Sequence, residues 1–236
     1  MVVQMRVREY GDAGPLVVVL HGGPGAAGEM APLARELADS FRVLEPFQRP
    51  SGEIPLTVAL HVSDLLAVVT PGSAIAGFSW GAMLALAFAA AHPELASPLV
   101  LIGCGTFDMP SRERLRANIA ERERLGLQVY YVDPLPGEAE PIEFDARGHE
   151  ETWADMLRLQ ESGVYPSAFS AIRGPVLMLH GAEDPHPGRM IWDNLRHYVP
   201  QIEYREWPRC GHYPWKERAV RDDFFAALKS WLRTRS

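Results

Sequence analysis

A serine between two glycines is the first residue of this sequence that points to chemistry. Gly77-Phe78-Ser79-Trp80-Gly81 follows a short apolar run, Ser73–Ala76, and opens a stretch, Gly81–Ala91, with the composition of a buried helix. A serine on a sharp turn between a strand and a helix exposes its hydroxyl above the sheet. Glycines two residues before and after it leave room for that turn, and the helix N-terminus favours negative charge. Ser79 is therefore the candidate nucleophile.

A glycine-rich turn supplies candidate hydrogen-bond donors for a developing negative charge. His21-Gly22-Gly23-Pro24-Gly25 directly follows the apolar run Leu16–Leu20. Acyl transfer needs backbone N–H groups aimed at the oxygen that becomes negative. We assign this oxyanion hole to the amides of Gly23 and of Trp80, the residue after the nucleophile. The glycine spacing fits neither a dinucleotide-binding turn nor a phosphate-binding loop, which also needs a lysine.

Two later turns supply an acid and a base. His180-Gly181-Ala182-Glu183-Asp184-Pro185 follows the apolar run Val176–Leu179, and ligands of open α/β sheets bind beyond such strand ends. We prefer Asp184 over Glu183 as the acid, with Glu183 as the alternative. His212, in a loop after the last expected strand, is the candidate base. The chain order Ser79, Asp184, His212 then matches a serine–histidine–acid triad.

The other histidines give no reason to expect a metal. His21 and His180 each precede a glycine at an expected strand end, where packing or hydrogen bonding beneath the site is the preferred interpretation. His186 lies between prolines, so contact with substrate and a surface position both stay open. No spacing of histidines and acids demands a metal ion, and the proposed chemistry needs no cofactor.

The expected elements alternate in a way that brings these residues to one edge of a sheet. Strands and helices that alternate along a chain predict an α/β fold with a mostly parallel sheet, and continuous apolar runs suit strands buried on both faces. Ile202–Trp207 is more polar, as expected for a sheet edge. The expected strands are Val3–Tyr10, Leu16–Leu20, Arg42–Leu44, Ser73–Ala76, Leu99–Ile102, Val176–Leu179 and Ile202–Trp207, and the expected helices are Glu29–Ala38, Thr57–Val69, Gly81–Ala91, Met190–Tyr198 and Arg218–Leu232.

One segment interrupts the alternation. From about residue 106 to 173 we find no convincing strand, but two helical stretches, Ser111–Leu125 and Glu150–Glu161, around a turn region rich in proline and glutamate, Pro134–Pro141. This segment is interpreted as an insertion within a single domain that spans residues 1–236. Its apolar residues are expected to divide between core packing and an acyl pocket; they are Trp153, Met156, Leu157, Leu159 and Tyr165.

Composition narrows the range of partners. The 236 residues carry a net charge of -7, which disfavours nucleic acid and anionic membranes, so a small-molecule acyl substrate is the expected partner. The N-terminus has no signal-peptide pattern, and no apolar run reaches the roughly 18 residues of a membrane span, so a cytoplasmic location is expected. Cys104 and Cys210 are expected to be reduced thiols.

Taken together, the motifs around Ser79, Gly23, Asp184 and His212 resemble the α/β-hydrolase superfamily, from Leu16 to Leu232. The resemblance implies an α/β-hydrolase fold, with a mostly parallel central sheet flanked by helices. It also implies that the insertion is a small helical cap, placed before the penultimate strand, that covers the site and selects the substrate.

Part of the chain is also similar to the proline iminopeptidase branch of that superfamily. The similarity lies in the His-Gly-Gly-Pro-Gly motif, the tryptophan after the serine, and Gln48-Arg49, although Phe47 and Phe78 replace the Asp and Gly usual there. The resemblance implies that cap carboxylates bind a free substrate amine. Glu150 and Glu151 are candidates by location, and an exposed helix face is the preferred explanation of both.

These residues predict a serine hydrolase that cleaves a small carboxylic ester, thioester or lactone through an acyl-enzyme. An iminopeptidase-like aminopeptidase and a slow-turnover ligand receptor on the same fold are the alternatives. An epoxide hydrolase or dehalogenase would need an aspartate in place of Ser79. A carbon–carbon hydrolase or a cofactor-free haloperoxidase would keep the same triad, so both stay open.

Overall fold

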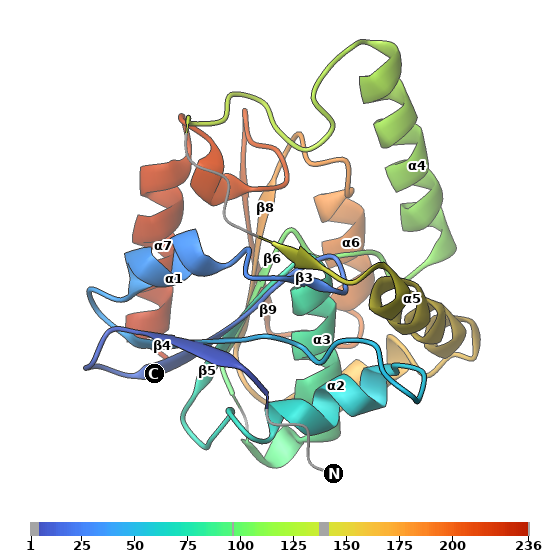
Figure 1. Ribbon diagram of the computed structural model, residues 1–236. Coiled ribbons are helices and arrows are strands. Elements are labelled where there is room, and N and C mark those ends of the chain that lie inside the picture. Colours follow the sequence, from blue (N-terminus) through green and yellow to red (C-terminus); the bar gives the residue numbers. More distant parts are fainter. Residues whose placement is uncertain (1–4, 96, 137–141, 236) are drawn as a thin grey trace.

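A seven-stranded sheet forms the centre of the computed structural model, which describes residues 5–95, 97–136 and 142–235. The strand order is β1-β4-β2-β5-β6-β8-β9, and every neighbouring pair is parallel except β1 with β4 (Figure 1). The strands are β1 (Val7–Tyr10), β2 (Leu16–Leu20), β4 (Arg42–Pro46), β5 (Ala74–Phe78), β6 (Leu99–Ile102), β8 (Val176–Gly181) and β9 (Ile202–Trp207). The expected α/β-hydrolase architecture is thus confirmed, with the more polar β9 at one edge.

Helices cover both faces of this sheet. The α-helices of the described residues are α1 (Ala31–Leu37), α2 (Val58–Leu65), α3 (Trp80–Ala91), α4 (Met109–Arg124), α5 (Ala146–Glu161), α6 (Gly188–Leu195) and α7 (Arg221–Arg233). Short 3-10 helices are η1 (Pro93–Leu95), η2 (Ser167–Ala171) and η3 (Pro214–Lys216). Figure 1 shows α1 and α7 together on one side of the sheet and α3 on the other.

Strand β2 shows why its sequence lacks the usual apolar–polar alternation. Val17 and Val19 belong to the core with α1 and α7, whereas Val18 and Leu20 belong to the core with α2, α3 and α6. All four side chains are fully buried. A strand between two helical layers buries alternate residues on opposite faces, which leaves an unbroken apolar run.

The insertion lies between β6 and β8 and contains α4 and α5, as the helical patterns predicted, and also η2, which they did not predict. The expectation of no strand there is wrong, because β7 (Glu143–Phe144) pairs antiparallel with β3 (Ala26–Ala27). Two exposed residues are too few to show a strand periodicity, and their pairing depends on a remote partner. Of the expected turn Pro134–Pro141, residues 137–141 lie outside the described part.

Helix α5 fastens the insertion to the main body through side chains. Glu151 and Asp155 accept the backbone N–H groups of Leu56 and Val58, at 2.8 and 2.9 Å, and so cap the region where α2 begins. His61 of α2 lies 3.0 Å from the Thr152 hydroxyl. No helix among the described residues is long and apolar enough to cross a membrane.

Candidate active site

Ser79 sits at the junction of β5 and α3 with a backbone that few residues adopt. Its φ and ψ angles are 52° and -114°, and its amide donates to the carbonyl of Ile102 at 2.8 Å. A Cβ at Gly77 would lie 2.2 Å from the Gly81 carbonyl oxygen, and one at Gly81 would lie 2.3 Å from that of Leu20. The two glycines are therefore required by the close packing of strand, turn and helix, as the motif predicted.

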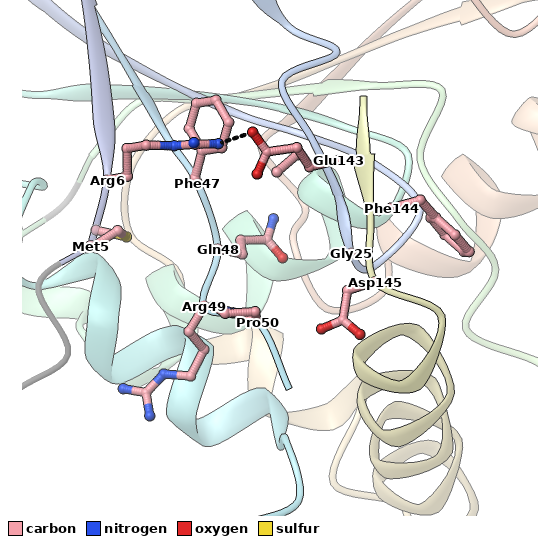
Figure 2. Close-up of a pocket in the computed structure, with 11 residues that line it drawn as sticks. Met5, Arg6, Gly25, Phe47, Gln48, Arg49, Pro50, Glu143, Phe144 and Asp145 are labelled. Atoms are coloured by element: carbon pink, nitrogen blue, oxygen red, sulfur yellow. Dashed lines mark hydrogen bonds and ion pairs between the residues drawn. The ribbon is translucent and has the colours of Figure 1, made fainter. Parts of the chain in front are cut away.

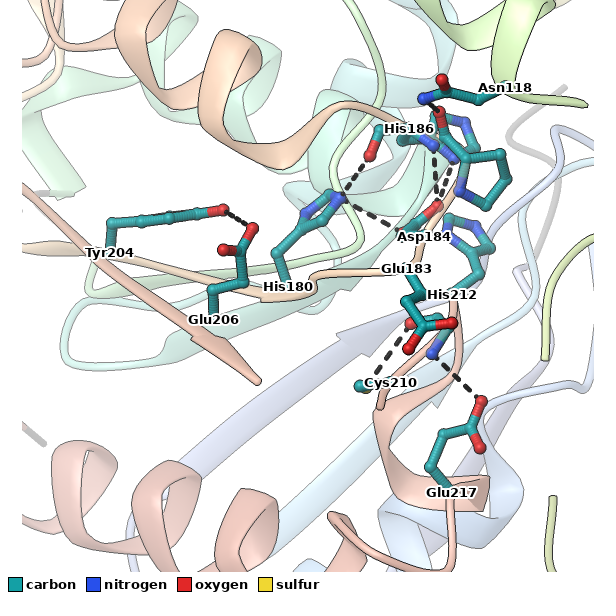
Figure 3. A network of polar contacts seen from close by, with 12 residues as sticks. Asn118, His180, Glu183, Asp184, His186, Tyr204, Glu206, Cys210, His212 and Glu217 are labelled. Carbon is teal, nitrogen blue, oxygen red and sulfur yellow. Dashed lines mark hydrogen bonds and ion pairs between the residues drawn. The ribbon is translucent and has the colours of Figure 1, made fainter. Parts of the chain in front are cut away.

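The carboxylate of Asp184 and the imidazole of His212 form a buried pair. Asp184 follows the carboxyl end of β8, and His212 lies in the loop between β9 and η3. The Nδ1 atom of His212 lies 2.6 Å from Asp184 Oδ2 (Figure 3). Glu183, the alternative acid, instead points outward with its side chain 45% exposed, near Arg122. The geometry therefore favours Asp184.

The electrostatics of the pair suit a neutral imidazole beside an ionised acid. Burial lowers the pKa of His212 below its ordinary value, and the neighbouring His186 lowers it further, against the attraction of Asp184. Burial alone would raise the pKa of Asp184, but His212, His186 and His180 together hold it well below its usual range. A neutral imidazole whose Nδ1–H is held by a carboxylate has its Nε2 lone pair free to accept a proton.

One cavity of about 550 Å³ brings the candidate residues together. Ser79, His212, Gly23 and Trp80 all line it. Among the described contacts of Ser79 and His212 there is no hydrogen bond between them; such contacts are often long before a substrate binds. Trp80 is the first residue of α3, so its amide has no acceptor within the helix.

Comparisons with known proteins identify the family of the chain. Residues 17–227 match the family described as Alpha/beta hydrolase family. The chain belongs to this family. It is 28% identical to the 2-hydroxymuconate semialdehyde hydrolase of Pseudomonas sp. (strain CF600), over 96% of this chain and 89% of that one. It is 23% identical to the pimeloyl-[acyl-carrier protein] methyl ester esterase of Nitrosomonas europaea, over 85% of this chain and 90% of that one.

A solved structure supports the same fold. The thermophilic esterase from Thermogutta terrifontis superimposes with a TM-score of 0.69 at 22% identity, over 98% of this chain and 94% of that chain. At that level of identity the likeness concerns the fold. The chain is accordingly a hydrolase of the alpha/beta hydrolase family.

Two buried histidines of this alpha/beta hydrolase lie beneath the site, as the preferred interpretation held. The Nε2 atom of His21 accepts the amide of Gln48 at 3.3 Å, and the Gln48 side chain in turn accepts the Trp80 indole N–H at 2.8 Å. Burial lowers the pKa of His21 to about 4, so it is neutral. His180 Nε2 lies 3.2 Å from Asp184 Oδ2 and 3.0 Å from the His186 carbonyl oxygen.

His186 occupies a position that the sequence left open. It lines the cavity, its ring stacks on that of His212 with centroids 4.5 Å apart, and its Nδ1 and backbone N–H each lie 2.9 Å from Asp184 Oδ1. Asp184 thus contacts three imidazoles, those of His180, His186 and His212 (Figure 3). Ligand atoms of Asp184, His186 and His212 lie within 4.8 Å of one another, a grouping that could hold a cation. Both Nδ1 atoms already face the carboxylate, which leaves their Nε2 atoms for other partners.

Glu29 is a cavity residue that sequence reasoning placed in a helix. The helix expected from Glu29 begins at Ala31, and the Glu29 side chain lines the cavity with only 7% of the residue exposed. Its Oε1 accepts the Gly22 amide at 2.5 Å, so that amide of the turn is already paired. Burial raises the pKa of Glu29 to about 7, although the Gly22 amide and Lys216 lower it.

The insertion contributes one wall of the cavity. Tyr130, Ile142, Phe144, His149 and Trp153 line it, and the Trp153 ring centroid lies 6.5 Å from that of Trp80. Met156 is fully buried in the core. The apolar residues of α5 therefore divide between pocket and core, as expected.

The cap acids considered for binding a substrate amine lie elsewhere. Neither Glu150 nor Glu151 lines the cavity. Glu151 binds the Leu56 amide and the Arg147 guanidinium instead.

A second cavity of about 530 Å³ lies beyond Gly25 (Figure 2). Its polar groups pair with neighbours: Arg6 with Glu143 at 2.7 Å, Arg49 with Asp64, and Asp145 with Ser51. None of the candidate catalytic residues lines it. The first cavity is therefore the candidate active site.

Proposed function

We propose that this protein is a serine hydrolase that cleaves a small carboxylic ester or related acyl substrate through an acyl-enzyme intermediate. The observation that carries the proposal is the 2.6 Å contact between Asp184 and His212, with the imidazole lining the same cavity as Ser79. A nucleophile, a base and an oriented acid in that arrangement are what acyl transfer requires.

In the proposed mechanism, His212 accepts the Ser79 proton at Nε2 as the hydroxyl oxygen attacks the substrate carbonyl. The resulting oxyanion accepts hydrogen bonds from the amides of Gly23 and Trp80. When the intermediate collapses, the bond to the leaving group breaks and the His212 imidazolium protonates that group. Water, activated by the same imidazole, then attacks the acyl-serine, and the acid and free Ser79 are released.

A second candidate is hydrolysis of a carbon–carbon bond by the same residues. It is favoured by the similarity to the 2-hydroxymuconate semialdehyde hydrolase across most of the chain. The similarity to the methyl ester esterase, which also covers most of the chain, favours the first candidate. An iminopeptidase-like activity lacks the cap carboxylates sought for it, because Glu150 and Glu151 do not line the cavity.

The test compares hydrolysis of p-nitrophenyl butyrate, proline p-nitroanilide and 2-hydroxymuconate semialdehyde by the purified protein. Ester turnover well above that of the other two supports the proposal. Faster cleavage of the anilide would instead assign an iminopeptidase-like activity, and faster loss of the semialdehyde would assign carbon–carbon hydrolysis. Binding of esters without turnover of any substrate would favour the receptor alternative.

A further inference from the structure

The charge of the candidate cavity follows from the ionisable side chains that line it. Its described lining includes one carboxyl group, that of Glu29, together with His149, His186 and His212. No lysine or arginine is part of that lining within residues 5–95, 97–136 and 142–235. A substrate carboxylate that entered this cavity would meet no permanent cation.

Glu29 lies close to the reacting serine. A Cβ built at Gly22 would lie 2.7 Å from Glu29 Oε1 and 3.1 Å from the Ser79 Cβ. The carboxyl group of Glu29 and the side chain of Ser79 therefore both lie against the same side of Gly22, together with the Phe78 ring. The Gly22 amide, which donates to Oε1, fixes the carboxyl group in that position.

The positive charge of Lys216 acts on Glu29 from outside the lining of the cavity. The Lys216 ammonium lies over the Tyr213 ring, 4.6 Å from its centroid, and does not line the cavity. Burial raises the pKa of Glu29 to about 7, although Lys216 lowers it, so the carboxylate predominates at pH 8. The charge of Lys216 thus stabilises the carboxylate of Glu29 and is not presented to a substrate in the cavity.

From this arrangement we propose that Glu29 restricts the enzyme to acyl groups that are uncharged or positively charged, and rejects acyl groups that end in a carboxylate. The inference rests on the proposed acyl-transfer function and specifies its substrate class. Two carboxylates in one poorly solvated cavity repel each other, and desolvation without a counter-charge adds to the cost. A hydroxyl, amide or ammonium group on the substrate would instead donate a hydrogen bond to Glu29.

The test uses three p-nitrophenyl esters of matched acyl length at pH 8: hexanoate, hemi-adipate and 6-(trimethylammonio)hexanoate. We expect kcat/KM for the hemi-adipate to lie at least roughly tenfold below that for the hexanoate, and the cationic ester to equal or exceed the hexanoate. The Glu29→Gln variant keeps an oxygen for the Gly22 amide. In this variant the difference in kcat/KM between the hexanoate and the hemi-adipate should narrow several-fold. Glu53→Gln, at an exposed position, is the matched control and should leave this difference unchanged.

A binding measurement separates this inference from the proposed function. Calorimetric titration with hexanamide, adipamic acid and 6-(trimethylammonio)hexanamide needs no turnover, and adipamic acid should bind roughly tenfold more weakly than hexanamide. Equal or tighter binding of adipamic acid by the unaltered protein would overturn the inference, whether or not any ester is cleaved. If adipamic acid bound more weakly than hexanamide but no ester were cleaved, the inference about Glu29 would be supported and the proposed function would be contradicted. If the folded Glu29→Gln variant showed the same difference between the uncharged and the carboxylate-bearing compounds as the unaltered protein, Glu29 would not be the cause of that difference.

Discussion

At the scale of single residues, Ser79 is positioned by its backbone and contributes only its hydroxyl to the proposed reaction. Its amide is held by Ile102, and its turn is held by Gly77 and Gly81. We therefore expect Ser79→Ala to lower kcat by at least about 10³-fold while the unfolding midpoint stays nearly unchanged. Steady-state kinetics and thermal unfolding of the same preparation check both parts. A folded variant that keeps a tenth of the activity would contradict the assignment.

The pH dependence follows from the pKa of His212, which burial lowers below 6.5. The base acts in its neutral form, so activity is present above this pKa and is lost as the pH falls through it. The acidic limb of kcat/KM is therefore expected to have its midpoint below pH 6.5 in the unaltered protein. A midpoint at or above the ordinary value for histidine would contradict the account of this site.

His186 lies against His212 and lowers its pKa. His186→Phe keeps an aromatic ring in the stack but removes that influence, so the acidic limb should move to higher pH. The shift is measured from kcat/KM between pH 4 and 8, with the exposed His197→Phe as the control variant. An acidic limb that stays in place would mean that His186 only packs against the base.

Sequence reasoning identified those candidate site residues that belong to a local motif. The glycines around Ser79, the glycine-rich turn and the residues after β8 and β9 each have a signal within a few positions. Glu29 and His186 carry no such signal, because their roles depend on what the fold packs against them. The position of the Glu29 carboxyl group is fixed by the hydrogen bond from the Gly22 amide. The position of the His186 ring is fixed by Asp184, which also holds His212.

At the scale of elements, the crossing of β5, α3 and β2 holds the nucleophile turn. Gly77→Ala would place a methyl group 2.2 Å from the Gly81 carbonyl oxygen, and backbone there cannot move without displacing Ser79. We expect a loss of at least about 2 kcal/mol in the free energy of unfolding, together with lost activity. Urea denaturation measures it, and Gly52→Ala, which meets nothing within 4 Å, is the control. Equal stability of the two variants would contradict the packing argument.

The same scale explains which elements the sequence predicted. Strands β2, β5, β6 and β8 are buried on both faces, so their apolar runs are unmistakable. Strand β7 consists of two exposed residues, Glu143 and Phe144, whose pairing with Ala26–Ala27 has no local signature. The helix expected to begin at Glu29 begins at Ala31 in the structure. Glutamate is a common helix residue, but here the Glu29 side chain lines the cavity.

At the scale of the whole molecule, the insertion and the sheet are expected to behave as one domain. Side chains of α5 bind the Leu56 and Val58 amides, and His61 lies within hydrogen-bonding distance of Thr152. Unfolding by urea should therefore give one transition, with coincident midpoints for helix content by circular dichroism and for tryptophan fluorescence. Trp153 in the insertion and Trp231 in α7 report on both parts. Two separated transitions would show that the insertion unfolds on its own.

Ser79 is proposed to be an activated nucleophile in an accessible cavity. The most direct test is to incubate the folded protein with a fluorophosphonate and to map the adduct by mass spectrometry. We expect a single phosphonylated residue, Ser79, and a strongly reduced labelling rate in His212→Gln, which removes the base. Failure of Ser79 to label in folded protein, or labelling at a different serine with equal speed in His212→Gln, would contradict this proposal.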